Sequence, residues 1–232
     1  MRGTRAHSSL VLFACLAALA LAGCAGSGSR GGPLGLALFG KPEPSGPRIE
    51  TAADRINALG DSAKRIDGMP PDEQQRLAAE LSQKLASEPE PLVRGHMLRT
   101  LAALDTPAAE LPMRAAMQDP DPDVRVACCE AWARRGGPQA LGILAEAVRS
   151  DADNDVRLAA ARALGDLEDP QAVAALAPVL EDDDPALQYR AVQSLRRVTG
   201  EDFGNDVNAW RQYVQGERPE TPSFAARLRQ WF

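Results

Sequence analysis

Few side chains in this sequence could act as nucleophiles or general bases. One of its two histidines lies in an N-terminal stretch typical of a cleaved leader, which leaves His96. Cys128 and Cys129 are adjacent, and the residues one repeat later are alanines, which indicates small and at least partly buried side chains. No serine or cysteine stands in a pattern that would pair with His96 as a nucleophile. We therefore predict no catalytic residue and two free thiols at 128 and 129, with a redox or covalent-attachment role as the alternative.

Aspartates gather in three short stretches that could bind a divalent cation or cap helices. These stretches are residues 119–123, 151–155 and 182–184. In the first two the spacing matches the start of an EF-hand loop, but Val124 and Val156 occupy the place of its glycine. The twelfth position should be a glutamate, and it is Glu130 in the first loop but Arg162 in the second. We predict helix capping and no metal or cofactor, with a weak divalent site at the first loop as the alternative.

The N-terminus has the pattern of a secretory leader. Arg2 and Arg5 precede an unbroken apolar run over residues 10–21. A membrane-spanning helix needs about 20 residues, so this run fits the apolar part of a signal peptide better. The chain is therefore expected to leave the cytoplasm, where ATP is found.

The residues that end this run suggest a lipid anchor. They read Leu21-Ala22-Gly23-Cys24, which resembles the lipobox of bacterial lipoproteins. The resemblance implies cleavage after Gly23, a diacylglycerol thioether on Cys24 and an acylated new N-terminus, and two or more acyl chains anchor a protein stably. Ala25 in place of an aspartate favours the outer membrane, on its periplasmic face, by analogy with lipoprotein sorting. An ordinary secreted protein cut nearby is the alternative.

The net charge argues against nucleic acid as a partner. Loss of the two leader arginines changes the formal charge of the 232-residue chain from −6 to −8. Proteins that bind DNA or RNA depend mainly on neutralising phosphates with basic side chains. No phosphate-binding glycine motif occurs either.

The chain is periodic over about residues 87–217. Val93, Val124, Val156 and Leu187 are spaced by 31, 32 and 31 residues. A large apolar residue follows each of these anchors by eight positions: Leu101, Trp132, Leu164 and Leu195. Prolines recur with the same period at 107, 138 and 170. Each period therefore predicts two helices, one beginning at the anchor and the other at the proline, which must stack on neighbouring pairs to bury their apolar faces.

The periodic segments resemble short HEAT-like repeats of the phycobilisome-lyase type. The resemblance is carried by DPDVRVACCEAWARRG, by DNDVRLAAARALGDLED and less well by DPALQYRAVQSLRRVTG. It implies an all-α fold, a right-handed α-solenoid of about four helix pairs with a C-terminal capping helix. It also implies that the repeated arginines pair with aspartates of the adjacent unit, in a ladder formed by Asp121, Arg125, Asp153 and Arg157. A basic row facing a ligand is the alternative.

The domain organisation follows from these patterns. We predict a signal peptide over 1–23, a flexible Gly/Ser/Pro tether over 24–47, N-terminal helices over 48–86, the repeat array with its cap over 87–217, and a linker with an amphipathic tail helix over 218–232. The N-terminal helices are expected at about 48–66 and 71–86, and the capping helix at about 207–215 with Trp210 packed inside. The tail is expected to dock on the array, to bind a partner or to lie at a membrane.

The surface expected to bind a partner lies on the helices that begin at the anchors. Six residues past each anchor stand Arg99, Glu130, Arg162 and Gln193, which differ while the anchors hold. We predict a lipid-anchored extracytoplasmic scaffold that binds a protein partner without catalysis. One alternative is a bilin-lyase-like accessory protein, because repeats of this type occur in enzymes that attach or remove a bilin on a cysteine; those enzymes are cytoplasmic. The other is a structural component of the cell envelope.

Overall fold

The computed structural model describes residues 49–219. The signal peptide, Cys24, the tether and the tail from residue 220 onward lie outside the described residues. Within the described part, no helix combines the length and the apolar character that a membrane crossing requires.

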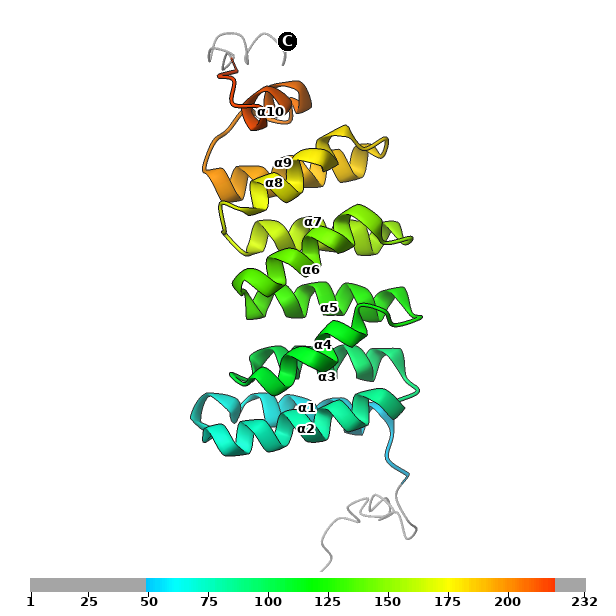
Figure 1. Ribbon diagram of the computed structural model, residues 1–232. Coiled ribbons are helices and arrows are strands. Elements are labelled where there is room, and N and C mark those ends of the chain that lie inside the picture. The colour runs from blue at the N-terminus through cyan, green and yellow to red at the C-terminus, as the bar shows by residue number, and fades with distance from the viewer. Residues whose placement is uncertain (1–48, 220–232) are drawn as a thin grey trace, which may run out of the picture. The chain divides into compact units, whose positions relative to one another are not determined.

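Ten α-helices occupy residues 49–219 and stack as successive pairs (Figure 1). One series of helices consists of α1 (Ala52–Ala63), α3 (Pro91–Ala103), α5 (Pro122–Arg135), α7 (Asn154–Asp166) and α9 (Pro185–Thr199). The other consists of α2 (Pro71–Ser87), α4 (Glu110–Ala116), α6 (Gly137–Ser150), α8 (Ala172–Leu176) and α10 (Val207–Val214). Short 3₁₀ helices are η1 (Ile66–Gly68), η2 (Pro107–Ala109) and η3 (Ala177–Glu181).

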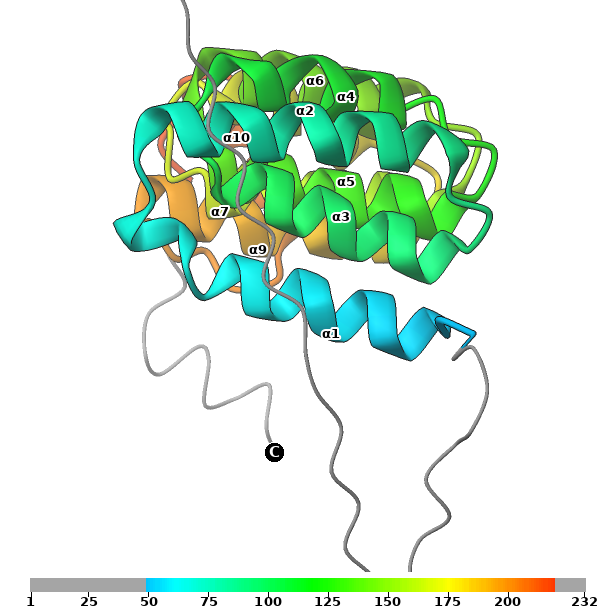
Figure 2. The ribbon, with the colours of Figure 1, turned by 90° about the horizontal axis from the view of Figure 1, so that it is seen from below.

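The two series form two layers. Viewed along the stack, α2, α4 and α6 lie above α3, α5, α7 and α9, and α1 lies below α3 (Figure 2). Each helix of the α3–α9 row contacts the next, and α1 contacts α3 less extensively. The fold is therefore the α-solenoid predicted from the sequence, and within residues 49–219 the helices α3 to α10 pack as four pairs.

The core explains the period of the sequence. All four anchors, Val93, Val124, Val156 and Leu187, have no exposed surface. The four apolar residues eight positions further along are equally buried. Trp132 is among them, as the sequence predicted. Because each helix buries these positions against both its own pair and its neighbours, the repeat is stable only when stacked.

Side-chain caps mark the start of three of the four anchor helices, while Glu90 before α3 makes no such cap. The Asp121 carboxylate accepts a hydrogen bond from the Asp123 N–H at 2.9 Å, and Asp153 and Asp184 cap α7 and α9 in the same way. Such caps satisfy amide groups that have no partner inside the helix. Helix α9 ends at Gly200, whose φ of 73° is left-handed and suits glycine.

The second helix of a pair is less regular than the sequence suggests. The helix expected from Pro107 begins as η2 before it becomes α4, and the helix expected from Pro170 is split into α8 and η3. Pro178 lies in η3 and has no N–H to donate to the carbonyl four residues earlier. The ladder of α-helical hydrogen bonds therefore stops there, and the chain tightens into a 3₁₀ helix.

Aromatic packing closes the C-terminal end of the described array. Phe203, Trp210 and Tyr213 contact one another with ring centroids 5.0 to 5.8 Å apart. The Trp210 indole is buried and donates a hydrogen bond to the Gly204 carbonyl at 3.1 Å. Trp210 thus packs inside the cap, as predicted, and α10 spans almost the residues expected.

Candidate functional site

The repeated arginines join each unit to the next through carboxylates. The Arg125 guanidinium donates to both carboxylate oxygens of Asp151, with Nε···Oδ2 and Nη2···Oδ1 distances of 2.9 Å. Arg94 binds Asp119 at 2.8 and 2.9 Å, and Arg157 pairs with Asp182. These three pairs lie in the turns between stacked units and are largely buried. Together they hold neighbouring units in register.

The carboxylates of this ladder differ from those predicted. The resemblance to HEAT-like repeats implied Asp121 and Asp153, but both cap their own helices. The ladder partners, Asp119 and Asp151, lie two residues earlier. In the D-x-D spacing, the first aspartate receives the guanidinium and the N–H of the second, and the second aspartate caps the helix.

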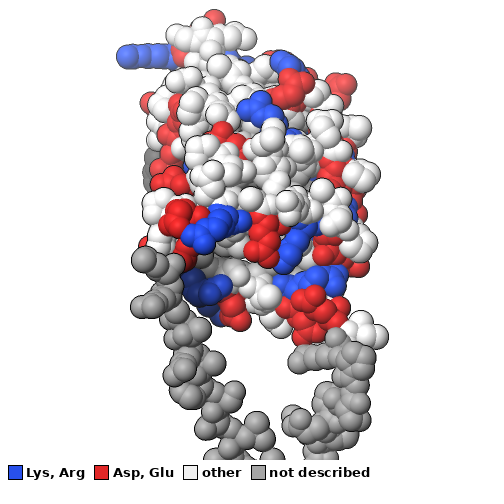
Figure 3. All heavy atoms as spheres, turned by 60° about the horizontal axis from the view of Figure 1, so that its bottom comes forward, with Lys and Arg blue, Asp and Glu red and all other residues white. Residues whose placement is uncertain are grey.

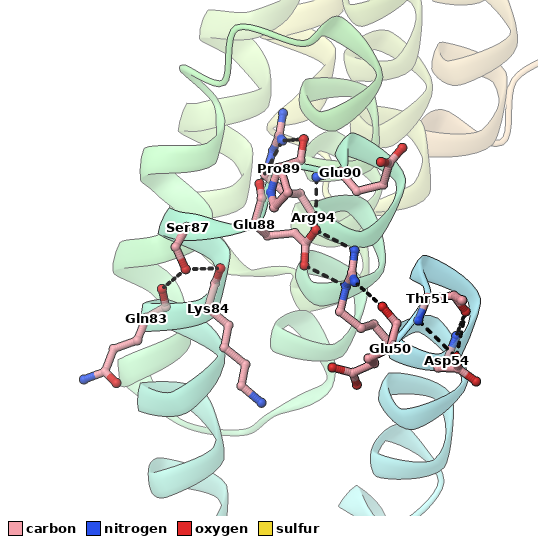
Figure 4. Close-up of polar contacts among 11 residues, drawn as sticks. Glu50, Thr51, Asp54, Gln83, Lys84, Ser87, Glu88, Pro89, Glu90 and Arg94 are labelled. Atoms are coloured by element: carbon pink, nitrogen blue, oxygen red, sulfur yellow. Dashed lines mark hydrogen bonds and ion pairs between the residues drawn. The ribbon is translucent and has the colours of Figure 1, made fainter. Parts of the chain in front are cut away.

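The ladder begins at α1, earlier than the sequence indicated. Arg55 of α1 pairs with Glu88, with Nε···Oε2 and Nη2···Oε1 distances of 3.0 and 3.1 Å. Figure 4 shows Glu88 between the start of α1 and the start of α3, close to Arg94. The Glu88 carboxylate also accepts the Glu90 N–H, as Asp119 accepts that of Asp121. The ladder therefore also ties α1 to the turn before α3.

The ladder shifts the ionisation of its members. The hydrogen bond from Arg94 to Asp119 raises the pKa of the arginine, and the Asp151 hydrogen bond does the same for Arg125. Burial alone would raise the pKa of Asp151, but hydrogen bonds from Arg125 and from the Asp153 N–H lower it below its ordinary value. Folding thus favours the charged forms of these pairs.

The four predicted partner-binding residues lie on one row of neighbouring helices. Arg99, Glu130, Arg162 and Gln193 come from α3, α5, α7 and α9. The first three are exposed and Gln193 is half-buried. Arg99 and Glu130 form an ion pair of 3.1 Å across α3 and α5, with side chains 45% and 48% exposed. We call this surface the α3–α9 face.

A groove lies on this face between α5 and α7. It has a volume of about 660 Å³. Small and apolar side chains line it: Val126, Ala133, Leu158, Ala159 and Ala163. Charged residues line it as well: Glu130, Arg134, Arg162, Asp166 and Arg190. The groove therefore brings Glu130 and Arg162 together, while Arg99 and Gln193 lie outside its lining.

Sequence reasoning missed three of the charged residues in the groove. Arg134 and Asp166 occupy the position ten residues past their anchors, and Arg190 the position three past its anchor. A helix places those positions near the sixth residue, one turn away, because neighbours on a helical face are three or four apart. Arg134 and Asp166 could therefore have been predicted from the sequence, because each lies one helical turn past the sixth residue after its anchor.

The thiols and the histidine are poorly placed for chemistry. Cys128 and Cys129 are both fully buried, and Cys128 donates to the Met113 carbonyl. Burial raises the pKa of Cys128 well above the ordinary thiol value and that of Cys129 to about 12. Burial, and then the charge of Arg99, lowers the pKa of His96. Protonated, inaccessible thiols are weak nucleophiles.

The acidic turns act as helix caps and ladder partners in the described structure. Across residues 49–219, no group of three or more His, Cys, Asp or Glu side chains is arranged to hold a metal ion. On the face in Figure 3, Lys and Arg lie beside Asp and Glu around the end formed by α1 and α2, and neither sign forms a broad field there.

Comparison with known proteins supports the repeats. The family model for HEAT repeats matches residues 78–164 and 143–207, which together span more than half of the chain. No curated protein matches the sequence. One matching solved structure is the complex of CpcE and CpcF of phycocyanin lyase from Nostoc sp. PCC7120, at 19% identity and a TM-score of 0.45. That match covers 65% of this chain and 95% of the other, and at this level it says nothing about activity.

Proposed function

The chain belongs to the HEAT-repeat family, and from this premise we propose that it is a lipid-anchored, extracytoplasmic scaffold that binds a protein partner on its α3–α9 face. The family match confirms the repeats predicted from the sequence. The single observation that carries the proposal is the contrast within the anchor helices. Their anchors are fully buried, while Arg99, Glu130 and Arg162, six residues further, are exposed and vary from unit to unit.

The proposed role of the array is to hold the outward side chains of the α3–α9 face at fixed positions for the partner. Stacked helices joined by the arginine–carboxylate ladder keep their outward side chains at fixed spacings. A preorganised surface binds with a smaller entropic cost than a flexible one. The proposal requires no chemistry from the described residues, and it is supported by the burial of both thiols.

The anchor and location are proposed from the leader sequence. Cys24 follows an apolar run and a lipobox-like Leu-Ala-Gly, and lipid there would hold the array at a membrane through the stretch from 25 to 47. We place it at the outer membrane, on the periplasmic face. A scaffold on such a tether reaches partners near the membrane surface.

Photo-crosslinking in native membranes tests the binding face. A photoreactive amino acid is placed at Arg162 on α7, or at Arg149 on α6 as the control, since both side chains are well exposed. We expect one reproducible protein to crosslink from position 162 and not from 149. Equal labelling from both positions, or crosslinks to the protein itself alone, would contradict a scaffold that binds a partner on this face. Self-crosslinks in an abundant protein would favour a structural component of the envelope, and bound tetrapyrrole a lyase-like role.

The anchor has a separate test. Mass spectrometry of the N-terminal peptide is expected to show cleavage before Cys24 and the added lipid. The Cys24→Ser variant is expected to leave the membrane fraction. An unmodified peptide that begins before residue 24 would contradict both the proposed lipid anchor and the proposed location.

A further inference from the structure

We propose that the groove between α5 and α7 binds an acidic segment of the protein partner, with an apolar side chain of that segment on the groove floor. This inference rests on the proposed function and specifies where and through what chemistry the partner binds.

The groove holds more positive charge than the residues around it neutralise. Arg134 and Arg190 have no carboxylate within ion-pair distance among residues 49–219. Arg162 has only Asp166, at 3.7 Å, and that carboxylate also pairs with Arg197 of α9. Glu130, the other carboxylate of the groove, already pairs with Arg99. Within this range two guanidinium groups are therefore unpaired, and a third, that of Arg162, shares its carboxylate with Arg197, so a ligand that brings carboxylates would find partners here.

Neighbouring intervals of the same face are closed by ion pairs. Arg99 and Glu130 bridge α3 to α5, and Asp166 and Arg197 bridge α7 to α9. Within the described residues, no such pair bridges α5 to α7 over the groove. The groove between α5 and α7 is thus the interval of the described α3–α9 face that lacks a bridging ion pair.

The groove floor suits a short apolar side chain. Val126 and Leu158 are only partly buried, and Ala133 and Ala159 lie between the charged residues without filling the space. Pockets that combine an apolar floor with a few polar groups are typical of recognition sites, and guanidinium groups bind carboxylates with two parallel hydrogen bonds.

The positive charge of the groove also favours an acidic protein segment over other ligands. The tail of this chain carries Arg227 and Arg229, which would meet the arginines of the groove. Nucleic acid needs many phosphate contacts, and the chain as a whole is acidic. An acidic protein segment satisfies the groove with a few carboxylates.

Peptide selection on the full-length protein in detergent tests this inference. A displayed library of short random peptides is selected on the wild type, on Arg134→Glu/Arg162→Glu, and on the control Arg76→Glu/Arg149→Glu. The control removes two exposed arginines of α2 and α6 and changes the net charge equally. We expect the wild type and the control to enrich peptides with several carboxylates beside an apolar residue, and the groove variant to enrich basic peptides instead.

Fluorescence anisotropy then measures the enriched peptides. The groove variant is expected to weaken binding about tenfold, as loss of two exposed charge pairs implies, and the control by less than about twofold. Arg134→Gln/Arg162→Gln gives the same answer if charge reversal impairs folding, which circular dichroism reports. Enrichment of neutral or basic peptides by the wild type would overturn the inference, and so would equal binding by groove and control variants. Binding of phosphatidylglycerol vesicles through these arginines, without acidic peptides, would overturn it in favour of a lipid surface.

The two proposals fail separately. A partner that crosslinks from position 162 while no acidic peptide is selected leaves the scaffold and removes the acidic ligand. If acidic peptides are selected but no partner crosslinks, the groove binds acidic segments and the proposed scaffold role is wrong.

Discussion

The Arg125 guanidinium of α5 binds both carboxylate oxygens of Asp151, which stands in the turn before the next anchor helix. A third N–H group of Arg125 donates to the Asp119 carbonyl at 2.8 Å. One side chain therefore ties the turn before its own helix to the turn before the following one. The same arrangement at Arg94, and at Arg55 with Glu88, makes this the device that sets the register of the array.

Arg125→Ala is expected to destabilise the array by about 2–4 kcal/mol, because it leaves the Asp151 carboxylate buried without its partner. The two side chains are only 15% and 10% exposed. Urea unfolding followed by circular dichroism measures the loss. Arg149→Ala is the control, since its pair with Glu146 is highly exposed and such pairs contribute at most about 1 kcal/mol. Equal midpoints for the two variants would show that the ladder contributes little.

The ladder also predicts a pH dependence. The pKa of Asp151 is lowered in the folded protein, so its contribution to stability is fully present above the unfolded pKa of about 3.9 and is lost as the pH falls through the folded pKa. We expect the difference in urea midpoint between wild type and Asp151→Asn to shrink between about pH 5 and pH 3. Asp183→Asn, at an exposed neighbouring turn, serves as the control and should follow the wild type. A difference that stays constant over this range would contradict the coupling to Asp151.

The sequence predicted the core of the array well because packing repeats strictly. Val93, Val124 and Val156 recur every 31 or 32 residues, and each is fully buried. The ion pair of α1 was not predicted, for a physical reason. Its arginine, Arg55, lies 33 residues before its carboxylate Glu88, whereas Arg125 lies 26 before Asp151. The long helix α2 lengthens the stretch of chain between the arginine and its carboxylate, although the ion pair itself is the same.

The candidate site was less accessible to sequence reasoning. In the D-x-D turns both aspartates are present, and only the fold decides that Asp119 binds an arginine while Asp121 caps a helix. Likewise the open charge of Arg134 and Arg190 depends on which carboxylates lie nearby in space. Residue types and periods specify which side chains face outward, but pairing between units depends on the geometry of the stack.

The cysteine pair makes a further prediction. Both thiols are fully buried, and burial raises the pKa of Cys129 to about 12. Because the thiolate is the reactive form, neither cysteine should react with a disulfide reagent at about pH 8 in the folded protein. Both should react once urea unfolds it. Rapid labelling of the native protein would show that α5 opens readily. It would then favour the alternative of a redox role for Cys128 and Cys129.

Close packing between α7 and α9 depends on a glycine. A Cβ built on Gly165 would lie 2.7 Å from the Ser194 Cβ and Oγ and 2.9 Å from its Cα, so these helices touch along their backbones. The Ser194 hydroxyl donates to the Ala161 carbonyl at 2.8 Å and fixes the same contact. Gly165→Ala should therefore destabilise the array by about 1–3 kcal/mol, despite the better helix propensity of alanine. Gly142→Ala is the matched control, because Gly142 faces open space in α6 and the change should stabilise by up to about 1 kcal/mol. Urea midpoints that rise for both variants would show that α7 and α9 can separate without loss, and would contradict the tight contact between Gly165 and Ser194.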